Sequence, residues 1–542
     1  MLQSYDEFVK CAMKELISTS GEFLRIKKNV SKLLQIPVPT NADLREAYEK
    51  LILVKKIKRN LAFENVLISK KIRTRSGVAV IAVLTKPYPC PGKCLYCPSE
   101  SKMPKSYLKN EPAVMRAISV KFNPYAQVQK RLHALELNGH KTDKIELIVM
   151  GGTFSYFPKK YQSWFILECF RAANDYGHKT YNIKHKTIDA KTPQRGVSTT
   201  LGREQKKNET AKRRIIGLTL ETRPDYIDEK EILNFRALGC TRVELGVQSI
   251  FDDVLEKNNR GHDVSETIRA TKFLKNAGFK INYHMMPGLY GSDAKKDYQM
   301  FEKLFSSPDF QPDMLKIYPT VVLRDSALYA VWKKGKYKAL SDKQFEEFIL
   351  RVKNNLIPPY VRIARLVRDV PAESIIAGPI VSNLRQLIAE KSQCQCIRCR
   401  EVGGNFKPKE SIILNRIDYD ASNGKEIFLE YVTKDTKKLF ALLRLRINPL
   451  ETRNQKTGVP ALKNSAIIRE VHTYGKMTQL NKKDLKSPQH IGLGKKLIAE
   501  AQKIAKDEFG LKKIAVISGI GAREYYRKLG YKLKDSYMLK YL

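Results

Sequence analysis

Between residues 78 and 317 the chain alternates short apolar runs with longer amphipathic segments. Such alternation is typical of a parallel sheet covered by helices. Six strands are predicted, at Val78–Leu84, Ile145–Met150, Ile215–Leu220, Arg242–Val247, Ile281–Met286 and Met314–Ile317. The helices expected between them are Tyr125–Leu137, Gln162–Asn174, Glu229–Leu238, Val264–Ala277 and Ala294–Leu304. The pattern indicates an α/β fold, a partial (β/α)6 barrel of the TIM type whose site is formed by the loops that follow the strands.

The flanking segments have other patterns. Residues 1–75 combine helical periodicity with basic clusters, which favours a helical region that binds the phosphates of a nucleic-acid backbone, a solvated helical face being the alternative. Residues 178–214 are polar and aperiodic, which indicates a basic loop insertion, either solvated or in reach of a polyanion. The alternation stops near residue 340, so 76–340 is assigned to the barrel and 341–410 to a linker. Residues 411–542 begin with runs typical of antiparallel strands and form a second domain.

Of the bulk properties, the net charge adds most to this picture. The 542 residues include 99 Lys and Arg against 56 Asp and Glu, a net charge of +43. Such an excess favours a polyanionic partner, nucleic acid first and an anionic membrane surface second. No apolar run reaches the about 18–20 residues of a membrane span, and the N-terminus has no secretion signal. We therefore expect a cytoplasmic protein that does not enter a membrane.

Nine cysteines, clustered and odd in number, favour metal binding in a reducing compartment over a disulfide framework. Three of them, Cys90, Cys94 and Cys97, lie in one short loop that directly follows the first predicted strand. A [4Fe–4S] cluster held by three thiolates leaves one iron open to a small molecule. This spacing resembles the radical S-adenosylmethionine (SAM) enzymes, whose open iron binds SAM. A zinc loop with a distant fourth ligand is the alternative.

Polar groups follow other strands at the same expected edge. Gly151 and Gly152 come after the second strand, where glycine lets the backbone approach a ligand closely. Radical SAM enzymes use a Gly-Gly element at this place to hold the SAM amino group. Stretches with polar side chains end the third and fourth strands. His284 and Lys316 interrupt apolar strands and are either satisfied core residues or functional ones. These further polar positions are Glu221–Asp225 and Glu244–Ser249.

A second cysteine cluster, Cys394, Cys396 and Cys399, has tighter spacing and no strand before it. We interpret it as a structural zinc clip whose fourth ligand is not identified. A second iron–sulfur cluster is the alternative.

The second domain contains a glycine-rich loop, Gln489–Leu497, that opens a helix after the strand Ala466–Gly475. Backbone N–H groups at a helix start are suited to bind a pyrophosphate. Together with the later stretch Tyr525–Tyr531, this order of elements is similar to the acetyl-CoA-binding GNAT acetyltransferases, which have an α+β fold.

A radical SAM barrel followed by a GNAT domain is a rare combination. The chain resembles the catalytic subunit of Elongator in its free-standing archaeal form, from about Lys71 to the C-terminus. Eukaryotic members space the first two cysteines more widely, whereas this chain has the spacing common to radical SAM enzymes. The stretches that carry the resemblance are Ser76–Val80, Glu111–Ala117, Met150–Phe154, Glu221–Asp225 and Arg523–Tyr531.

The resemblance implies an enzyme that converts the wobble uridine of tRNA, at position 34, into 5-carboxymethyluridine. It implies that the basic N-terminal region binds tRNA and that Tyr526 lies near the acetyl-CoA sulfur and protonates the leaving thiolate. His472 and Glu470 are candidates for activating water. The cluster ligands implied are Cys90, Cys94 and Cys97, and the acetyl-CoA contacts are Lys144, Glu470, Val471, His472, Thr473, Leu493, Gly494, Lys495 and Tyr526.

In the reaction that the resemblance implies, SAM yields a 5′-deoxyadenosyl radical that takes a hydrogen from the acetyl methyl group. The carbon radical adds to uracil C5, and hydrolysis of the thioester leaves the carboxymethyl group. This chemistry needs an electron donor and an anticodon base turned out of its stack; no obligatory protein partner is evident. The alternatives are a protein lysine acetyltransferase with a structural iron–sulfur domain, and a non-catalytic RNA-binding scaffold. The GNAT-like domain disfavours another radical SAM reaction on RNA, such as methylthiolation.

Overall fold

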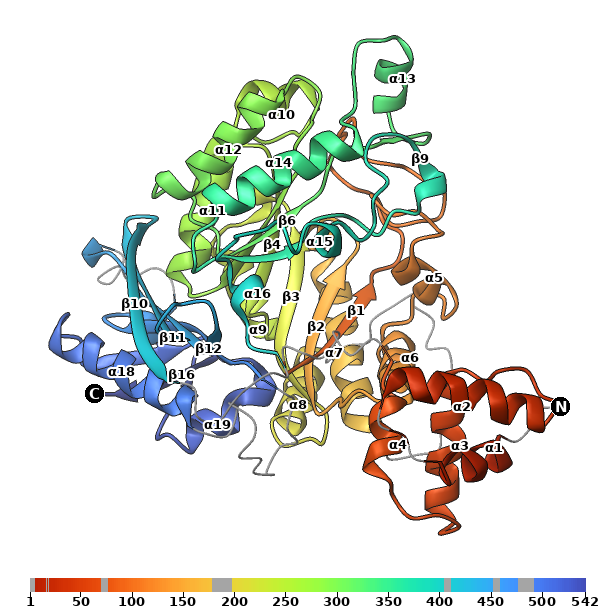
Figure 1. Cartoon of the computed structure of the whole chain (residues 1–542). Helices are drawn as coiled ribbons and strands as arrows, with labels where there is room; N and C mark the ends of the chain where they lie inside the picture. Colours follow the sequence, from red (N-terminus) through yellow and green to blue (C-terminus); the bar gives the residue numbers. More distant parts are fainter. Residues whose placement is uncertain are drawn as a thin grey trace.

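The computed structural model describes residues 5–15, 17, 19–69, 77–177, 197–403, 411–451, 459–475 and 492–542. A helical N-terminal module and a C-terminal domain lie on opposite sides of a central α/β barrel (Figure 1). Within the described residues, no helix combines the length and the apolar character needed to cross a bilayer.

The central sheet has seven parallel strands in the order β1-β2-β3-β4-β5-β6-β8. The six strands expected from the sequence are present, so the predicted half-barrel is confirmed. The seventh, β8, pairs in parallel with β6. The strands are β1 (Ala79–Leu84), β2 (Lys144–Met150), β3 (Arg214–Thr222), β4 (Arg242–Gln248), β5 (Lys280–Met285), β6 (Met314–Ile317) and β8 (Arg362–Arg365).

The assignment of residues 341–410 to a linker is therefore wrong in part, because helix and strand alternate beyond residue 340. Helix α14 (Asp342–Asn355) buries Phe345 and Ile349 and leads into β8. Strand β8 escaped prediction because it is short and carries an arginine at each end, which gives it no apolar run.

Helices pack against one face of the sheet (Figure 1). In β2 the residues that face the helices, such as Leu147 and Val149, are fully buried, whereas Glu146, Ile148 and Met150 on the other face are partly exposed. The main helices are α6 (Pro124–Leu137), α7 (Lys159–Asp175), α9 (Glu229–Leu238), α11 (Val264–Asn276) and α12 (Ala294–Ser306). Shorter elements are α5 (Pro112–Ile118), α10 (Asp252–Lys257), α13 (Leu328–Lys333), α15 (Leu384–Leu387), α16 (Ile397–Arg400), β7 (Val322–Leu323) and β9 (Ile375–Ala377).

Part of the segment predicted as a basic loop is a helix, α8 (Val197–Asn208), and β3 begins at Arg214. Residues 178–196 lie outside the described residues. The helix escaped prediction because most of its buried side is polar. Glu204 and Asn208 hydrogen-bond Asn174, and Gln205 bonds the Ala237 carbonyl.

The N-terminal module has its own apolar core, to which Phe8, Phe23, Tyr48 and Phe63 contribute. Its third helix is capped at Thr40, whose hydroxyl accepts a hydrogen bond from the backbone N–H of Asp43. The basic residues Lys70–Arg75 lie outside the described residues. The helices are α1 (Asp6–Ala12), α2 (Ser20–Leu33), α3 (Asn41–Leu53) and α4 (Leu61–Val66).

The C-terminal domain is a second seven-stranded sheet in the order β10-β11-β12-β13-β14-β16-β15, with helices α18 (Leu493–Asp507) and α19 (Arg523–Arg527). Only β13 and β14 are parallel, and they pair over Ala466–Ile468 alone. Beyond this point β13 stays paired with β12 to Thr473, so β13 and β14 splay apart. The strands are β10 (Ile412–Ala421), β11 (Gly424–Thr433), β12 (Leu439–Ile447), β13 (Ala466–Thr473), β14 (Lys513–Val516), β15 (Lys532–Lys534) and β16 (Tyr537–Tyr541).

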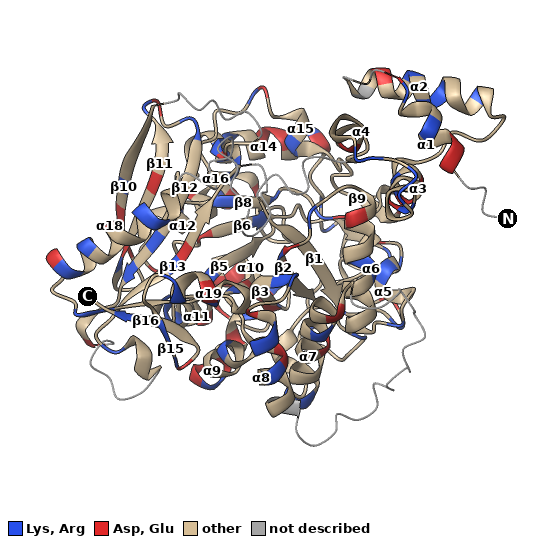
Figure 2. Ribbon diagram, turned by 90° about the horizontal axis from the view of Figure 1, so that it is seen from below, with Lys and Arg blue, Asp and Glu red and all other residues tan. Residues whose placement is uncertain are grey.

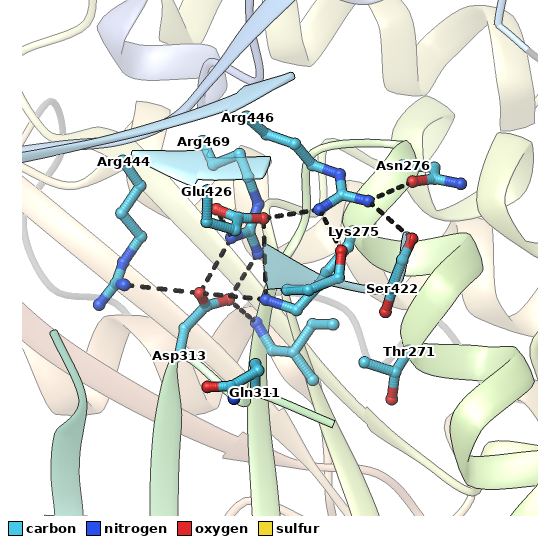
Figure 3. A network of polar contacts seen from close by, with 12 residues as sticks. Thr271, Lys275, Asn276, Gln311, Asp313, Ser422, Glu426, Arg444, Arg446 and Arg469 are labelled. Carbon is cyan, nitrogen blue, oxygen red and sulfur yellow. Dashed lines mark hydrogen bonds and ion pairs between the residues drawn. The ribbon is translucent and has the colours of Figure 1, made fainter. Parts of the chain in front are cut away.

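The two sheets meet in an extensive interface at the amino-terminal end of the barrel strands. Gly519 lies against β3 so closely that a Cβ there would be 2.0 Å from the Ile216 carbonyl oxygen. Beside it, charged groups from both domains form a buried ionic network around Asp313 and Glu426 (Figure 3). The two domains are therefore fixed to each other by packing and by buried charge.

Candidate functional site

The cysteine loop leaves the sheet at the carboxyl end of β1 and its thiols are held by surrounding side chains. Cys97 Sγ lies 2.7 Å from Ser106 Oγ, and Arg260 Nη1 donates to Cys94 Sγ at 3.6 Å. Cys90 and Cys94 are partly exposed, and Cys97 is buried. A cavity of about 270 Å³ adjoins the loop, lined by Cys90 and Gly92 with Tyr88, Ser99, Glu100 and Lys105.

The loop fits a cluster and a small bound molecule. Buried polar atoms without a hydrogen-bond partner among the described residues gather here: Arg260 Nε, Arg223 Nη1 and Tyr96 Oη. Buried groups are normally paired, so such atoms indicate a polar ligand or ordered water. A Cβ at Gly92 would lie 2.5 Å from Arg223 Nη1, 3.5 Å from Cys94 Sγ and 3.7 Å from Cys90 Sγ. The chain at Gly92 is thus as close to the thiols as glycine permits.

Gly151 and Gly152 follow β2 and have positive φ angles of 133° and 90°. Both thus adopt backbone conformations that glycine reaches easily. A Cβ at Gly151 would lie 1.9 Å from Thr85 Oγ1, at the end of β1. Cys90 Sγ is 3.9 Å from Thr153 Oγ1. The structure therefore brings the predicted Gly-Gly element and the cysteine loop together.

Gly151→Ala is expected to lower 5′-deoxyadenosine formation about a hundredfold, because the new Cβ displaces the backbone beside the cysteine loop by about 1 Å or more. Gly202→Ala is the matched control, since a Cβ at Gly202 would have nothing within 4 Å and the residue has no positive φ. The measurement is the rate of 5′-deoxyadenosine release by the reconstituted enzyme. Equal rates for the two variants would contradict a role of Gly151 in binding.

A charged cluster lies on the concave face of the half-barrel. Glu244 accepts hydrogen bonds from His284 Nε2 at 2.9 Å, from Asn282 Nδ2 at 3.1 Å and from Lys316. Burial acts to raise the pKa of Glu244, but Lys316 and His284 outweigh it and hold that pKa well below its usual range. Tyr107 donates to Glu221 at 3.0 Å at the edge of the same cluster. The two ambiguous strand residues, His284 and Lys316, are thus partners of one buried carboxylate.

Three of the residues that the resemblance implied as acetyl-CoA contacts, Val471, Thr473 and Gly494, lie close together at the splayed part of β13. A Cβ at Gly494, in the first turn of α18, would lie 3.5 Å from Thr473 Oγ1, 3.8 Å from Val471 Cγ1 and 3.4 Å from Tyr525 Oη. Leu493 is buried beneath this turn, and Lys495 is exposed. Gln489–Ile491, at the start of the predicted glycine loop, lie outside the described residues.

The tyrosines in α19 have different surroundings. Tyr526 is 7% exposed and packs between the rings of Tyr525 and Tyr531, and its burial raises its pKa well above the usual range. Tyr525 is 38% exposed, with its hydroxyl beside Gly494. Of the two, Tyr525 is therefore the one that the described contacts place at the start of α18.

Glu470 links the two domains. Its carboxylate accepts from Lys280 Nζ at 2.9 Å, at the start of β5, and from Arg444 Nε at 3.0 Å. Burial alone would raise the pKa of Glu470, but Lys280 and Arg444 lower it strongly. A carboxylate held ionised by two cations is a weak base, so the geometry favours a positioning role for Glu470 over activation of water.

His472 and Lys144 lie near the same end of the barrel. His472 packs against Tyr474, with ring centroids 4.3 Å apart, and contributes to lowering the pKa of Glu146 on β2. Lys144 is the first residue of β2, on the same face as Glu146, and burial lowers its pKa. Strand β2 therefore presents Lys144 at its amino-terminal end and Gly151 beyond its carboxyl end.

The second cysteine cluster has the geometry of a site for one metal ion. The ligand atoms of Cys394, Cys396 and Cys399 all lie within 4.8 Å of one another. This is the one such group of His, Cys, Asp and Glu found within the described ranges. Its thiols suit zinc, which thiolate ligands hold at about 2.3 Å.

The sequence did not single out Arg260 or Lys280. Arg260 lies in the turn after α10, 166 positions from the thiol it contacts. Lys280 is separated from Glu470 by 190 positions. The one local signal for Lys280 is a charged residue at the start of an otherwise buried strand.

Comparisons with known proteins agree with this site. Residues 88–301 match the domain family described as the radical SAM superfamily, and residues 312–393 match the radical SAM C-terminal domain. The parallel half-barrel, the cysteine loop and the family match together identify the chain as a radical SAM enzyme.

Full-length relatives narrow the family. The tRNA uridine(34) acetyltransferase of Methanocaldococcus jannaschii is 42% identical over 100% of this chain and 96% of its own length. Human Elongator complex protein 3 is 38% identical over 88% of this chain and 86% of its own. The solved structure of archaeal Methanocaldococcus infernus Elp3 with an N-terminal deletion matches with a TM-score of 0.70, at 40% identity over 86% of this chain and 100% of that one. The chain belongs to the tRNA uridine(34) acetyltransferase family, which includes Elongator complex protein 3.

Proposed function

We propose that the chain converts the wobble uridine of tRNA into 5-carboxymethyluridine, using SAM at the cysteine loop and acetyl-CoA at the C-terminal domain. The observation that carries the proposal is that one chain, whose domains pack tightly together, contains both a cysteine-loop site and a second site in the C-terminal domain. A three-thiol loop lies at the carboxyl end of the barrel strands, and a splayed β13 with the start of α18 lies toward the amino-terminal end. Full-length similarity to tRNA uridine(34) acetyltransferases supports the choice of substrate.

The cysteine loop and its surroundings have the residues needed to hold an iron–sulfur cluster and SAM. Cys90, Cys94 and Cys97 would hold a [4Fe–4S] cluster, and Gly151 and Gly152 would lie beside SAM. The cluster and SAM, when bound, supply a 5′-deoxyadenosyl radical. Uracil C5 lacks an acidic or leaving group for ordinary acid–base substitution, so a radical is the suited reagent. The chain's own residues hold the reactants in place and keep them apart from bulk water.

The C-terminal domain is proposed to be a GNAT domain that binds acetyl-CoA. Its parallel strands β13 and β14 pair only over Ala466–Ile468 and then splay apart, a geometry that suits an extended amide-containing arm. The start of α18 would meet the pyrophosphate, because helix N-termini favour anions. Lys144, Glu470 and His472 would lie around the acyl end.

Tyr526 is proposed to protonate the leaving thiolate, since a phenol with a raised pKa remains protonated. Tyr526→Phe is then expected to lower the rate of acetyl-CoA hydrolysis about a hundredfold at unchanged KM. Tyr525→Phe, the matched variant one position away, is expected to raise KM and leave kcat nearly unchanged. Steady-state kinetics of CoA release check both. The reverse pattern would assign the proton to Tyr525.

Three further assignments complete the proposal. Cys394, Cys396 and Cys399 hold a structural zinc ion near β8. The N-terminal module, residues 1–75, and the exposed basic residues of α8 contact the phosphates of the anticodon stem-loop. Figure 2 shows Lys and Arg positions along the ribbons of α8 and of the N-terminal helices. The exposed basic residues of α8 are Arg203, Lys206 and Lys207.

Anaerobic reconstitution tests the proposal. The protein, loaded with iron and sulfide, is incubated with SAM, a reductant, acetyl-CoA and tRNA, and each component is omitted in turn. We expect 5-carboxymethyluridine only in the complete mixture. Acetylation of a basic peptide without SAM or tRNA would favour a protein acetyltransferase instead. Binding of tRNA without any SAM cleavage would favour a scaffold.

A further inference from the structure

We propose that Lys316 reads the 4-carbonyl oxygen of the target uracil inside the half-barrel and thereby selects uracil over cytosine. This inference rests on the proposed function and deepens it, since it names the residue that recognises the base. The base would lie on the concave face of the sheet, with its flat faces against an apolar wall and its polar edge toward β4, β5 and β6.

The concave face has two chemically different walls. On β1 and β2 the inward residues are the apolar Val80, Ala82, Ile148 and Met150, and the charged Lys144 and Glu146 lie on the same face toward the amino-terminal end of β2. All are partly exposed, while the neighbouring strand residues that face the helices are buried. On β4, β5 and β6 the inward positions carry polar groups, among them Glu244, His284 and Lys316. A pyrimidine has apolar faces and a hydrogen-bonding edge, which matches this division.

Lys316 is a cation of this polar wall that has hydrogen-bonding capacity left. An ammonium group has three N–H donors, and the described contacts of Lys316 Nζ are with Glu244 alone. Its side chain is 13% exposed, whereas that of Glu244 is 2% exposed. Burial would lower the pKa of Lys316, but Glu244 outweighs it and raises that pKa, so the group stays charged.

An unsatisfied acceptor lies in the same cluster. Asn282 is fully buried, its amide nitrogen donates to Glu244, and its Oδ1 atom has no hydrogen-bond partner among the described residues. A buried acceptor of this kind indicates a polar ligand or water beside it. Asn282 thus helps to hold Glu244, and the partly exposed Lys316 offers the donors that face the barrel interior, to which the O4 acceptor of uracil is complementary.

The place of the cluster fits the reaction. Lys316 pairs with His284 in the parallel ladder, near the carboxyl ends of β6 and β5, where the cysteine loop emerges. The start of β5, at Lys280, contacts Glu470 of the C-terminal domain. A base beside Lys316 would therefore lie between the cysteine loop and the C-terminal domain, the two sites whose reactants must both reach C5.

Selectivity for uracil over cytosine follows from the group that each base carries at C4. Uracil has an acceptor oxygen at C4, and cytosine has an amino group that can only donate. The Lys316 ammonium group can donate to the C4 oxygen of uracil but is repelled by the C4 amino group of cytosine. We expect the purified full-length protein to bind an anticodon stem-loop with U34 about tenfold more tightly than the same stem-loop with C34, because hydrogen bonds to charged groups are worth about that factor or more.

Lys316→Gln tests this directly, because an amide both donates and accepts. We expect this variant to bind the U34 and C34 stem-loops equally, with phosphate contacts keeping overall affinity within a few-fold. Lys272→Gln, which removes one charge from an exposed position on α11, should keep the preference for U34. An unchanged preference in Lys316→Gln would overturn the proposal.

A second measurement uses the wild-type protein and needs no variant to fold. A stem-loop with 4-thiouridine at position 34 places a photoreactive sulfur where O4 would lie. Irradiation should yield a cross-link on the peptide that contains Lys316, identified by mass spectrometry, and cross-links confined to other peptides would refute the assignment. If 5-carboxymethyluridine still forms in that case, the proposed function stands and only the base-binding site falls.

Discussion

Replacing Cys94 by alanine is expected to abolish both 5′-deoxyadenosine formation and modification of tRNA. Cys94 is one of three thiols in the loop and lies beside Arg260 and Gly92. A cluster left with two thiolate ligands loses the site at which SAM would bind. Iron and sulfide content after reconstitution, together with 5′-deoxyadenosine release, are the measurements.

Cys11→Ala is the matched control. Cys11 is a partly exposed free cysteine in the N-terminal module, on α1 and outside both sites. We expect its removal to leave iron content and 5′-deoxyadenosine release unchanged. Full modification of tRNA by the Cys94→Ala protein would show that the cysteine loop does not generate the reactive species.

Replacing Asp313 by asparagine is expected to destabilise the protein by about 3–5 kcal/mol, the cost of removing one partner of a buried ion pair. Asp313 is fully buried between the two domains (Figure 3). It accepts from Arg469 Nη2 at 2.6 Å, and Arg444 Nη1 lies 3.6 Å away. Burial opposes its ionisation, but Arg469 and Lys275 outweigh burial and lower its pKa strongly. Urea unfolding of the full chain measures the loss, and an unchanged midpoint would contradict it.

Lys275 in the same network is expected to behave differently. Its Nζ atom is 3.8 Å from both Asp313 and Glu426, and no described group hydrogen-bonds it. Burial lowers its pKa to about 8 from 10.5, against the opposing effect of Asp313 and Glu426. Lys275→Met should therefore change stability near neutral pH by less than about 1 kcal/mol, because Asp313 and Glu426 keep arginine partners when this ammonium group is removed.

The lowered pKa of Lys275 also predicts how the stability of the protein changes with pH. Between about pH 8 and 10.5 the unfolded chain binds more protons at Lys275 than the folded chain does, so stability from this group rises with pH across that window. Lys275→Met should remove that rise. Unfolding curves at several pH values in this range provide the check, and an unaltered slope would show that Lys275 keeps its ordinary pKa.

Much of the fold could be predicted because its signal is local. Strands β1 to β6 are apolar runs between amphipathic helices, and their predicted bounds differ from the observed ones by one or two residues. Strand β8 and helix α8 were missed for one reason. Both are polar in sequence, and their polar side chains are satisfied by residues far away, such as Glu401 for Arg362 and Asn174 for Asn208.

The sites divide in the same way. The cysteine loop and the Gly-Gly element could be found because their chemistry is contained in a few consecutive residues. The roles of Glu470 and Lys316 could not, because each depends on partners from other strands: Lys280 lies 190 positions before Glu470, and Glu244 lies 72 positions before Lys316. Sequence periodicity indicates which face a residue occupies but not the charge it will meet there.

The most direct test of the central claim follows the acetyl carbon. The reconstituted enzyme is given acetyl-CoA labelled with carbon-13 at the methyl position, together with SAM, reductant and tRNA, and the nucleosides are analysed by mass spectrometry. The proposed function predicts the label in the carboxymethyl group of uridine 34, together with release of 5′-deoxyadenosine. Unlabelled uridine 34 despite SAM cleavage, or label found on protein lysines alone, would contradict it.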